Sequence, residues 1–180
     1  IREKIDRPFQ AITSDMTEIA FKGGKAYLCV HKDVFGQMIY GFAVGLKQDL
    51  SLVMNSFNQA SRKIEGRVSK STIYHQDQGT QYTSYRYIQA VLNIGRISFS
   101  QKGTPTENPG QESFFGRFKE ENRAEFQECK TFEELKLKIG EKIKYYNNER
   151  IHTSIGYQSP KSFTESHLKS WSNWFTKCRG

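Results

Sequence analysis

The sequence predicts one α/β domain built on a mixed five-stranded sheet with helices on both faces. Strand-like segments rich in Val, Ile, Tyr, Phe and Thr come first, and shorter ones then alternate with segments of helical periodicity. A chain of 180 residues is long enough for one domain with a sizeable core, and 13% aromatic residues argue against disorder. These observations exclude a fibrous or disordered chain.

Three strands are expected at residues 9–19, 26–31 and 38–44. Gly23-Gly24 separates the first pair, and the segment from Asp33 to Gly36 separates the second pair. Short connections of this composition are typical of hairpin turns. The first three strands should therefore be antiparallel neighbours.

Helices and strands alternate in the next part of the chain. Apolar residues recur at helical spacing over residues 49–64 and 84–93, and strand-like segments follow at 72–75 and 96–99. The resulting order, β-β-β-α-β-α-β followed by helices, is that of an RNase H-like fold. Other mixed α/β folds share this order.

The segment 100–110 is rich in polar residues, Gly and Pro, a composition that is typical of a loop. Asn108 is a suitable N-cap and Pro109 a suitable first residue for a helix that runs to about residue 123. Thr131 and Glu134 have the spacing of a capping box that begins another helix.

We divide the chain into one domain over residues 1–164 and an amphipathic helical tail over 165–180. The tail carries an apolar stripe at helical spacing, formed by Leu168, Trp171, Trp174 and Phe175. Such a stripe either packs on its own domain or contacts another subunit.

The charge is positive and evenly distributed. The chain has 27 Lys and Arg against 19 Asp and Glu, a net charge of +8, with 12 basic and 8 acidic residues up to residue 90. A basic field of this kind suits a nucleic acid, although solubility alone would also explain it. No apolar segment approaches the length of a membrane span, and no signal peptide is evident. Three separated cysteines fit a reducing cytoplasm and indicate neither disulfides nor a zinc finger.

Three carboxylates have the setting of metal ligands. Asp77 comes just after a predicted strand, where ligands gather in open α/β sheets, and Asp15 lies inside a strand, where Asp is uncommon. Asp15 on the solvent face of an edge strand is the alternative. Glu112 falls on the first turns of the helix that follows Asn108, and Lys119 lies two turns further along the same face.

Three hard oxygen donors suit Mg²⁺ or Mn²⁺, and two such ions can activate an attacking oxygen and stabilise the leaving oxygen of a phosphodiester. Glu107 lies before the helix cap and Asp33 begins a turn where its side chain would bond the backbone, so neither is expected to be a ligand.

At these residues the sequence resembles the catalytic core of bacterial insertion-sequence transposases related to retroviral integrases, the DDE recombinases. The resemblance covers residues 15–160. The matching blocks, in the family's order, are SDMT at 14–17, HQDQGTQYTS at 75–84, SQKGTP at 100–105, NPGQESFF at 108–115, FKEE at 118–121, YNNERIH at 146–152 and GYQSP at 156–160.

The resemblance implies that Asp15, Asp77 and Glu112 bind two Mg²⁺ or Mn²⁺ ions, and that Lys119 contacts DNA. It implies metal-dependent cleavage of a DNA strand followed by attack of a 3′-hydroxyl on target DNA, by a homo-oligomer acting on transposon ends and target. Recognition of those ends would lie outside this chain.

Further candidates for DNA contact are Lys102, Gln81 and Tyr82 in the matching blocks. Arg150 either reaches a phosphate or forms a structural ion pair, and we favour the ion pair. A membrane or a small-molecule substrate is not expected. Two alternative functions are an RNase H-type nuclease, which only hydrolyses, and a non-catalytic DNA-binding remnant of a transposase.

Overall fold

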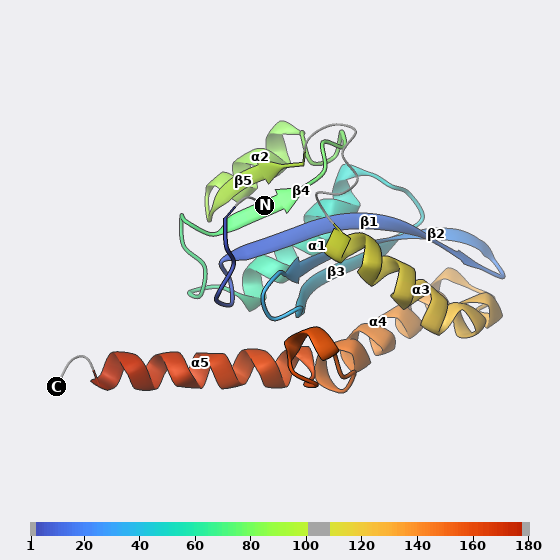
Figure 1. The fold of residues 1–180 in the computed structure, drawn as a ribbon. Coiled ribbons are helices and arrows are strands. Elements are labelled where there is room, and N and C mark those ends of the chain that lie inside the picture. Colours follow the sequence, from blue (N-terminus) through green and yellow to red (C-terminus); the bar gives the residue numbers. More distant parts are fainter. Residues whose placement is uncertain (1–2, 101–108, 178–180) are drawn as a thin grey trace.

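The structure is a computed structural model that describes the backbone of residues 3–100 and 109–177, and side chains over 3–100 and 113–169. Its elements follow the predicted order (Figure 1). They are β1 (Ala11–Phe21), β2 (Gly24–Asp33), β3 (Ile39–Gly45), α1 (Leu50–Lys63), β4 (Ile73–Gln76), α2 (Tyr85–Leu92), β5 (Arg96–Phe99), α3 (Pro109–Glu128), α4 (Phe132–Asn148), a 3-10 turn (Thr153–Ile155) and α5 (Pro160–Lys177).

The five strands form one mixed sheet in the order β3-β2-β1-β4-β5. β1, β2 and β3 pair antiparallel through their hairpins, whereas β4 lies parallel to β1 and β5 parallel to β4. The parallel pairs follow from the helical connections α1 and α2, because parallel neighbours need a crossover. The predicted RNase H-like arrangement of the sheet is confirmed.

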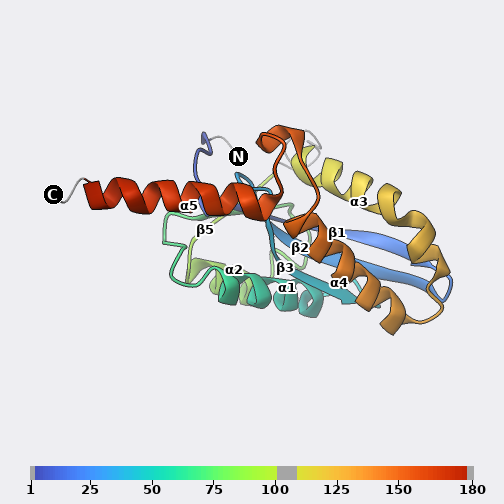
Figure 2. The same ribbon diagram turned by 90° about the horizontal axis from the view of Figure 1, so that it is seen from below.

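Helices cover both faces of the sheet, as predicted. Along β1, Ile12 packs with α1 and α2, whereas Ile19 and Phe21 pack with α3 and α4. This division follows from the strand's alternation, which sends successive side chains to opposite faces. Figure 2 shows α3 and the α1–α2 pair on opposite sides of the strands.

Two predicted helix starts are confirmed and one predicted helix end is wrong. Thr131 and Glu134 form the capping box of α4, and Pro109 begins α3, while Asn108 lies outside the described residues. α3 continues past the predicted end near residue 123 to Glu128. Phe126, 2% exposed, and Cys129 complete the core that α3 and α4 share, so burial extends the helix.

α5 begins at Pro160, so the predicted boundary at residue 164 falls inside one helix. Its first turns pack on the domain, since the ring centroids of Phe163 and Phe35 are 5.3 Å apart and Leu168 packs against the α1–α2 core. The side chains of Trp171, Trp174 and Phe175 lie outside the described part. Among the described helices, none combines the length and the apolar character that crossing a membrane requires.

Candidate carboxylate site and the adjoining cavity

Asp15 lies on β1, and Asp77 directly follows β4, the strand that pairs with β1. β1 and β4 pair in parallel with Ala11 level with Ile73 and Thr13 level with His75. β4 ends at Gln76, and the same offset continued for two more residues would bring Asp77 level with Asp15. Neighbouring strands lie about 4.8 Å apart, so we expect the two carboxylates to lie near one another at this end of β1 and β4.

Asp15 belongs to the sheet face that α3 covers, whereas Asp77 is exposed in the loop after β4. Asp15 is four residues before Ile19 on β1, and Ile19 packs with Phe115 and Phe118 of α3. Residues an even number apart on a strand share a face. Since β1 is the central strand, the alternative of an edge strand is wrong for Asp15, whose side chain is half-buried.

Local hydrogen bonds hold both carboxylates. Asp15 Oδ1 accepts from Met16 N at 2.7 Å, and Asp77 Oδ1 accepts from Gly79 N at 3.0 Å. A Cβ on Gly79 would lie 3.0 Å from Asp77 Oδ1, so a glycine allows this close approach. The side chain of Gln81 donates to Gln48 O at 2.9 Å and joins the loop to the segment before α1.

Tyr82, a candidate for DNA contact, lies in the core beneath this loop. Its side chain is fully buried, and its hydroxyl is 3.0 Å from Ser14 Oγ, next to Asp15. In this structure Tyr82 therefore supports β1 from the opposite face, and it offers no surface to a DNA strand.

Glu112 lies in the first turn of α3, the helix that packs over β1. Its side chain is outside the described part. Among the side chains that are described, no group of three or more His, Cys, Asp or Glu is placed to hold a metal ion. The grouping of Asp15, Asp77 and Glu112 therefore stays a prediction. Lys102 and Glu107 also lie outside the described residues.

Lys119 lies on α3 beside β1, partly exposed. The pKa of Glu18 on β1 is lowered mainly by a hydrogen bond from Lys25, with a smaller contribution from the charge of Lys119. Lys119 therefore adds positive charge near Glu18 of β1, from the helix that packs on the sheet face of Asp15.

Asp33 ends β2 and bonds the backbone, as predicted. Its carboxylate accepts from Phe9 N at 2.9 Å and Gly36 N at 2.5 Å, and burial raises its pKa to about 6. These bonds join the segment at Phe9 and the β2–β3 turn to the end of β2. They give the buried carboxylate of Asp33 a structural role that requires no metal ion.

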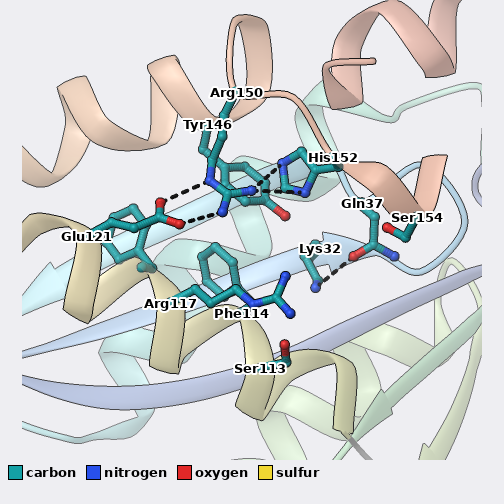
Figure 3. A pocket seen from close by; sticks show the side chains of 11 residues that line it. Lys32, Gln37, Ser113, Phe114, Arg117, Glu121, Tyr146, Arg150, His152 and Ser154 are labelled. Atoms are coloured by element: carbon teal, nitrogen blue, oxygen red, sulfur yellow. Dashed lines mark hydrogen bonds and ion pairs between the residues drawn. The ribbon is translucent and has the colours of Figure 1, made fainter. Parts of the chain in front are cut away.

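A cavity of about 290 Å³ opens between β2, α3 and the end of α4 (Figure 3). The sequence analysis did not predict this cavity. The residues that line it are mostly polar: Lys32, Gln37, Ser113, Phe114, Arg117, Phe118, Glu121, Tyr146, Arg150, His152 and Ser154. A lysine at an inward position of a strand was the available signal, because Lys is rarely buried without a specific reason.

Arg150 is held by structural contacts at one end of this cavity. Its Nε donates to Glu121 Oε2 at 2.9 Å, its second nitrogen pairs with the other carboxylate oxygen, and its guanidinium lies 5.9 Å from the ring centroid of Tyr146. The hydrogen bond from Arg150 lowers the pKa of Glu121, and burial, with the charge of Arg150, lowers the pKa of His152 to about 4. The ion pair that we favoured for Arg150 is present.

Comparison with protein families identifies two matches, both described as the integrase core domain, over residues 5–105 and 95–160. The chain is 38% identical over 164 residues to the transposase for insertion sequence element IS904 of Lactococcus lactis, covering 89% of this chain and 63% of the relative. It is 35% identical over 168 residues to an uncharacterized transposase-like protein of Haemophilus influenzae, covering 90% and 74%. The first relative therefore extends well beyond the region matched here.

The fold resembles that of retroviral integrase cores. The HTLV-2 integrase catalytic core domain, solved in complex with magnesium in a trimeric form, superposes with a TM-score of 0.69 at 15% identity, covering 88% of this chain and 97% of that chain. At this identity the likeness concerns the fold alone.

Proposed function

Because the chain belongs to the integrase core domain family, we propose that it is the catalytic core of an insertion-sequence transposase that cuts DNA and joins strands. The observation that supports this proposal is the position of Asp15 on the central strand, on the sheet face that α3 covers, with Asp77 directly after the neighbouring strand β4. Glu112, in the first turn of that helix, supplies the third carboxylate.

We assign the binding of divalent metal to these three residues. Asp15 and Asp77 fit such a group, since Asp15 on β1 and Asp77 just after β4 both offer hard oxygen donors, and Asp77 lies in a loop beside Gly79. Magnesium is present in the solved HTLV-2 core of the same fold, which supports Mg²⁺ or Mn²⁺ here. Two ions, bound at this site, would activate an attacking oxygen and offset charge on the scissile phosphate.

The chain's own residues then position the DNA strand. Asp15 stands on the rigid central strand, supported from below by Ser14 and Tyr82, so its carboxylate is pre-organised. Lys119 provides a cation for a phosphate near the carboxylates. The reaction is the attack of water, and then of a 3′-hydroxyl, on phosphorus, with the leaving strand departing as a 3′-oxygen and no covalent bond between protein and DNA.

The proposed partners are transposon ends and target DNA, and a homo-oligomer is the proposed active form. The net charge of +8 supports a polyanionic partner, and the trimeric form of the HTLV-2 core supports assembly. The bacterial cytoplasm, where the nucleoid lies, is the proposed location because the substrate is DNA.

A strand-transfer assay with a full-length transposase that contains this domain tests the proposal. Asp77→Asn and Glu112→Gln should each lower Mg²⁺-dependent joining by at least about 100-fold, because each removes charge from the metal site. Glu120→Gln, an exposed residue of the same helix, is the matched control and should retain activity. Joining that survives either site substitution would refute the carboxylate site.

Calorimetry of Mn²⁺ binding to the 180-residue chain separates metal binding from the rest of the reaction. The unmodified chain should bind Mn²⁺, and Asp77→Asn should weaken this binding at least about tenfold. Release of a nicked strand without joining in the full-length assay would favour the nuclease alternative.

A further inference from the structure

The cavity beside α3 adjoins the proposed carboxylate site. In the β1–β2 register, Asp15 is level with Val30 and Thr13 is level with Lys32. Lys32 is thus a diagonal neighbour of Asp15 on the face that α3 covers. Ser113, which also lines the cavity, directly follows Glu112 on α3. The cavity and Asp15 therefore share one face of the sheet.

Positive charge dominates the cavity. Among the eleven described residues that line it, three are Lys or Arg and one, Glu121, is a carboxylate. Glu121 is engaged at the far end by Arg150. In Figure 3 the ammonium of Lys32, the guanidinium of Arg117 and the hydroxyl of Ser113 point toward one common space, away from Glu121.

Lys32 is fixed in position at the floor of this space. Its side chain is 2% exposed, its Nζ donates to Gln37 Oε1 at 3.1 Å, and Nζ lies 5.2 Å from the ring centroid of Phe114. It stands on β2, an internal strand of the sheet. A cation held in this way loses little freedom when an anion binds, whereas an exposed lysine must be ordered first.

The aromatic walls do not offer a stacking surface for a base. Phe114 and Tyr146 are each 5% exposed and pack edge to face against each other, with ring centroids 5.1 Å apart. Arg150 lies over the ring of Tyr146. Three of the polar groups that line the cavity are donors suited to the oxygens of a phosphate: the ammonium of Lys32, the guanidinium of Arg117 and the hydroxyl of Ser113.

We propose that this cavity is a phosphate subsite, in which Lys32, Arg117 and Ser113 hold one backbone phosphodiester of a DNA strand that crosses the carboxylate site. This assignment rests on the proposed function for the identity of the strand as DNA. Arg117 reaches from an exposed position of α3 and is the adaptable contact, while Lys32 is the fixed one. The subsite would set the register of the strand on the protein.

Binding of inorganic phosphate to the 180-residue chain tests the cavity itself. In a titration followed by amide NMR shifts, the amides of Lys32, Ser113 and Arg117 should move together and saturate. Arg117→Gln should weaken the binding about tenfold, because it removes one charge-assisted contact. Arg123→Gln, an exposed arginine six residues along the same helix, is the matched control and should leave the titration unchanged.

DNA binding tests whether the ligand of the cavity is a backbone phosphodiester. Affinity is measured with the Asp77→Asn chain in EDTA, so that catalysis does not affect the result. A duplex with a single-stranded 3′ end is prepared with a neutral methylphosphonate at one position at a time. One position should weaken binding to the Asp77→Asn chain, which keeps Arg117, about tenfold. That position should have no further effect on Arg117→Gln, whereas Arg123→Gln should keep the full position-specific loss.

The outcomes separate this inference from the proposed function. Equal methylphosphonate profiles for Arg117→Gln and Arg123→Gln, or the absence of saturable phosphate shifts at the cavity, would overturn the subsite. Phosphate binding in the cavity by a chain that binds no DNA would overturn the phosphodiester as ligand, together with DNA as the partner. A methylphosphonate loss that depends on Arg117 would support the subsite. If Asp77→Asn also kept full joining activity in the strand-transfer assay, the carboxylate chemistry would be refuted while the subsite stood.

Discussion

The side chain of Asn147 hydrogen-bonds both backbone groups of Ile39. Its Oδ1 accepts from Ile39 N at 2.9 Å and its Nδ2 donates to Ile39 O at 2.8 Å. Asn147 is in the last turn of α4 and Ile39 begins β3, 108 residues earlier in the chain. The amide therefore joins α4 to the sheet in the way that a neighbouring strand would.

Replacing Asn147 with alanine should lower the free energy of unfolding by about 2–3 kcal/mol, because two buried backbone groups lose their partners. Urea unfolding followed by circular dichroism measures this change. Asn148→Ala is the matched control, since its exposed side chain bonds only Lys144 O within the helix. Equal losses for the two variants would mean that the bonds to Ile39 contribute nothing specific.

Gly41 on β3 is the position where α1 approaches the sheet backbone. A Cβ there would lie 2.1 Å from Ser56 O and 2.7 Å from Ala60 N. Gly41→Ala should therefore destabilise the fold by at least about 2 kcal/mol, since α1 must move away. Gly140 of α4 has only Phe42 Cζ at 3.7 Å from such an atom, so Gly140→Ala should stabilise by about 0.5–1 kcal/mol. Thermal unfolding of both variants would show opposite signs, and two losses would contradict the packing described.

The fold was predictable because each element carried a local signal. Alternation marked the strands, the pair Thr131 and Glu134 marked the start of α4, and Gly23-Gly24 marked the first hairpin. The end of α3 was not predictable in this way. Its last residues are helical because Phe126 and Cys129 pack on a core that α4 completes, and a long-range contact leaves no local pattern.

The sequence predicts the carboxylates of the candidate site as a set of residues, but it does not predict how they are arranged. Asp15 stands out inside a strand and Asp77 just after one, whereas their separation in space depends on the parallel register of β1 and β4. The cavity could not be predicted from the sequence, because Lys32 on β2 comes near Arg117 on α3 only when the helix packs on the sheet. Spacing along one segment cannot report a register or a docking angle.

His31 should make stability fall at acidic pH. The side chain is fully buried between Ser56 Oγ, 2.8 Å from Nδ1, and the hydroxyl of Tyr87, and burial lowers its pKa to about 3. An unfolded chain binds a proton at this residue below a pKa of about 6.5, whereas the folded chain stays neutral, so acid favours unfolding. Between pH 7.5 and pH 5 this linkage lowers the free energy of unfolding by about 2 kcal/mol.

The variant His31→Gln isolates this effect. Urea unfolding at both pH values should show that the variant loses about 2 kcal/mol less than the unmodified chain, whatever its stability at pH 7.5. Asp33, whose raised pKa makes stability fall as pH rises through about 4 to 6, is present in both proteins, and its contribution cancels in the difference. Parallel pH profiles would show that His31 does not titrate differently in the two states.

The ion pair of Arg150 and Glu121 predicts that Arg150 acts on stability and leaves DNA affinity unchanged. The pair is partly exposed, with 20% and 44% of the two side chains accessible, so solvent screening limits its strength. A double-mutant cycle with Arg150→Gln and Glu121→Gln should give a coupling of about 0.5–1 kcal/mol.

The salt dependence of DNA binding provides the second measurement. Lys119→Gln should lower its slope by about 1, as expected for a lost phosphate contact, and Arg150→Gln should leave the slope unchanged. A slope lowered equally by both substitutions would assign Arg150 to the DNA-binding surface, since a residue that acts only on folding has no counterions to release.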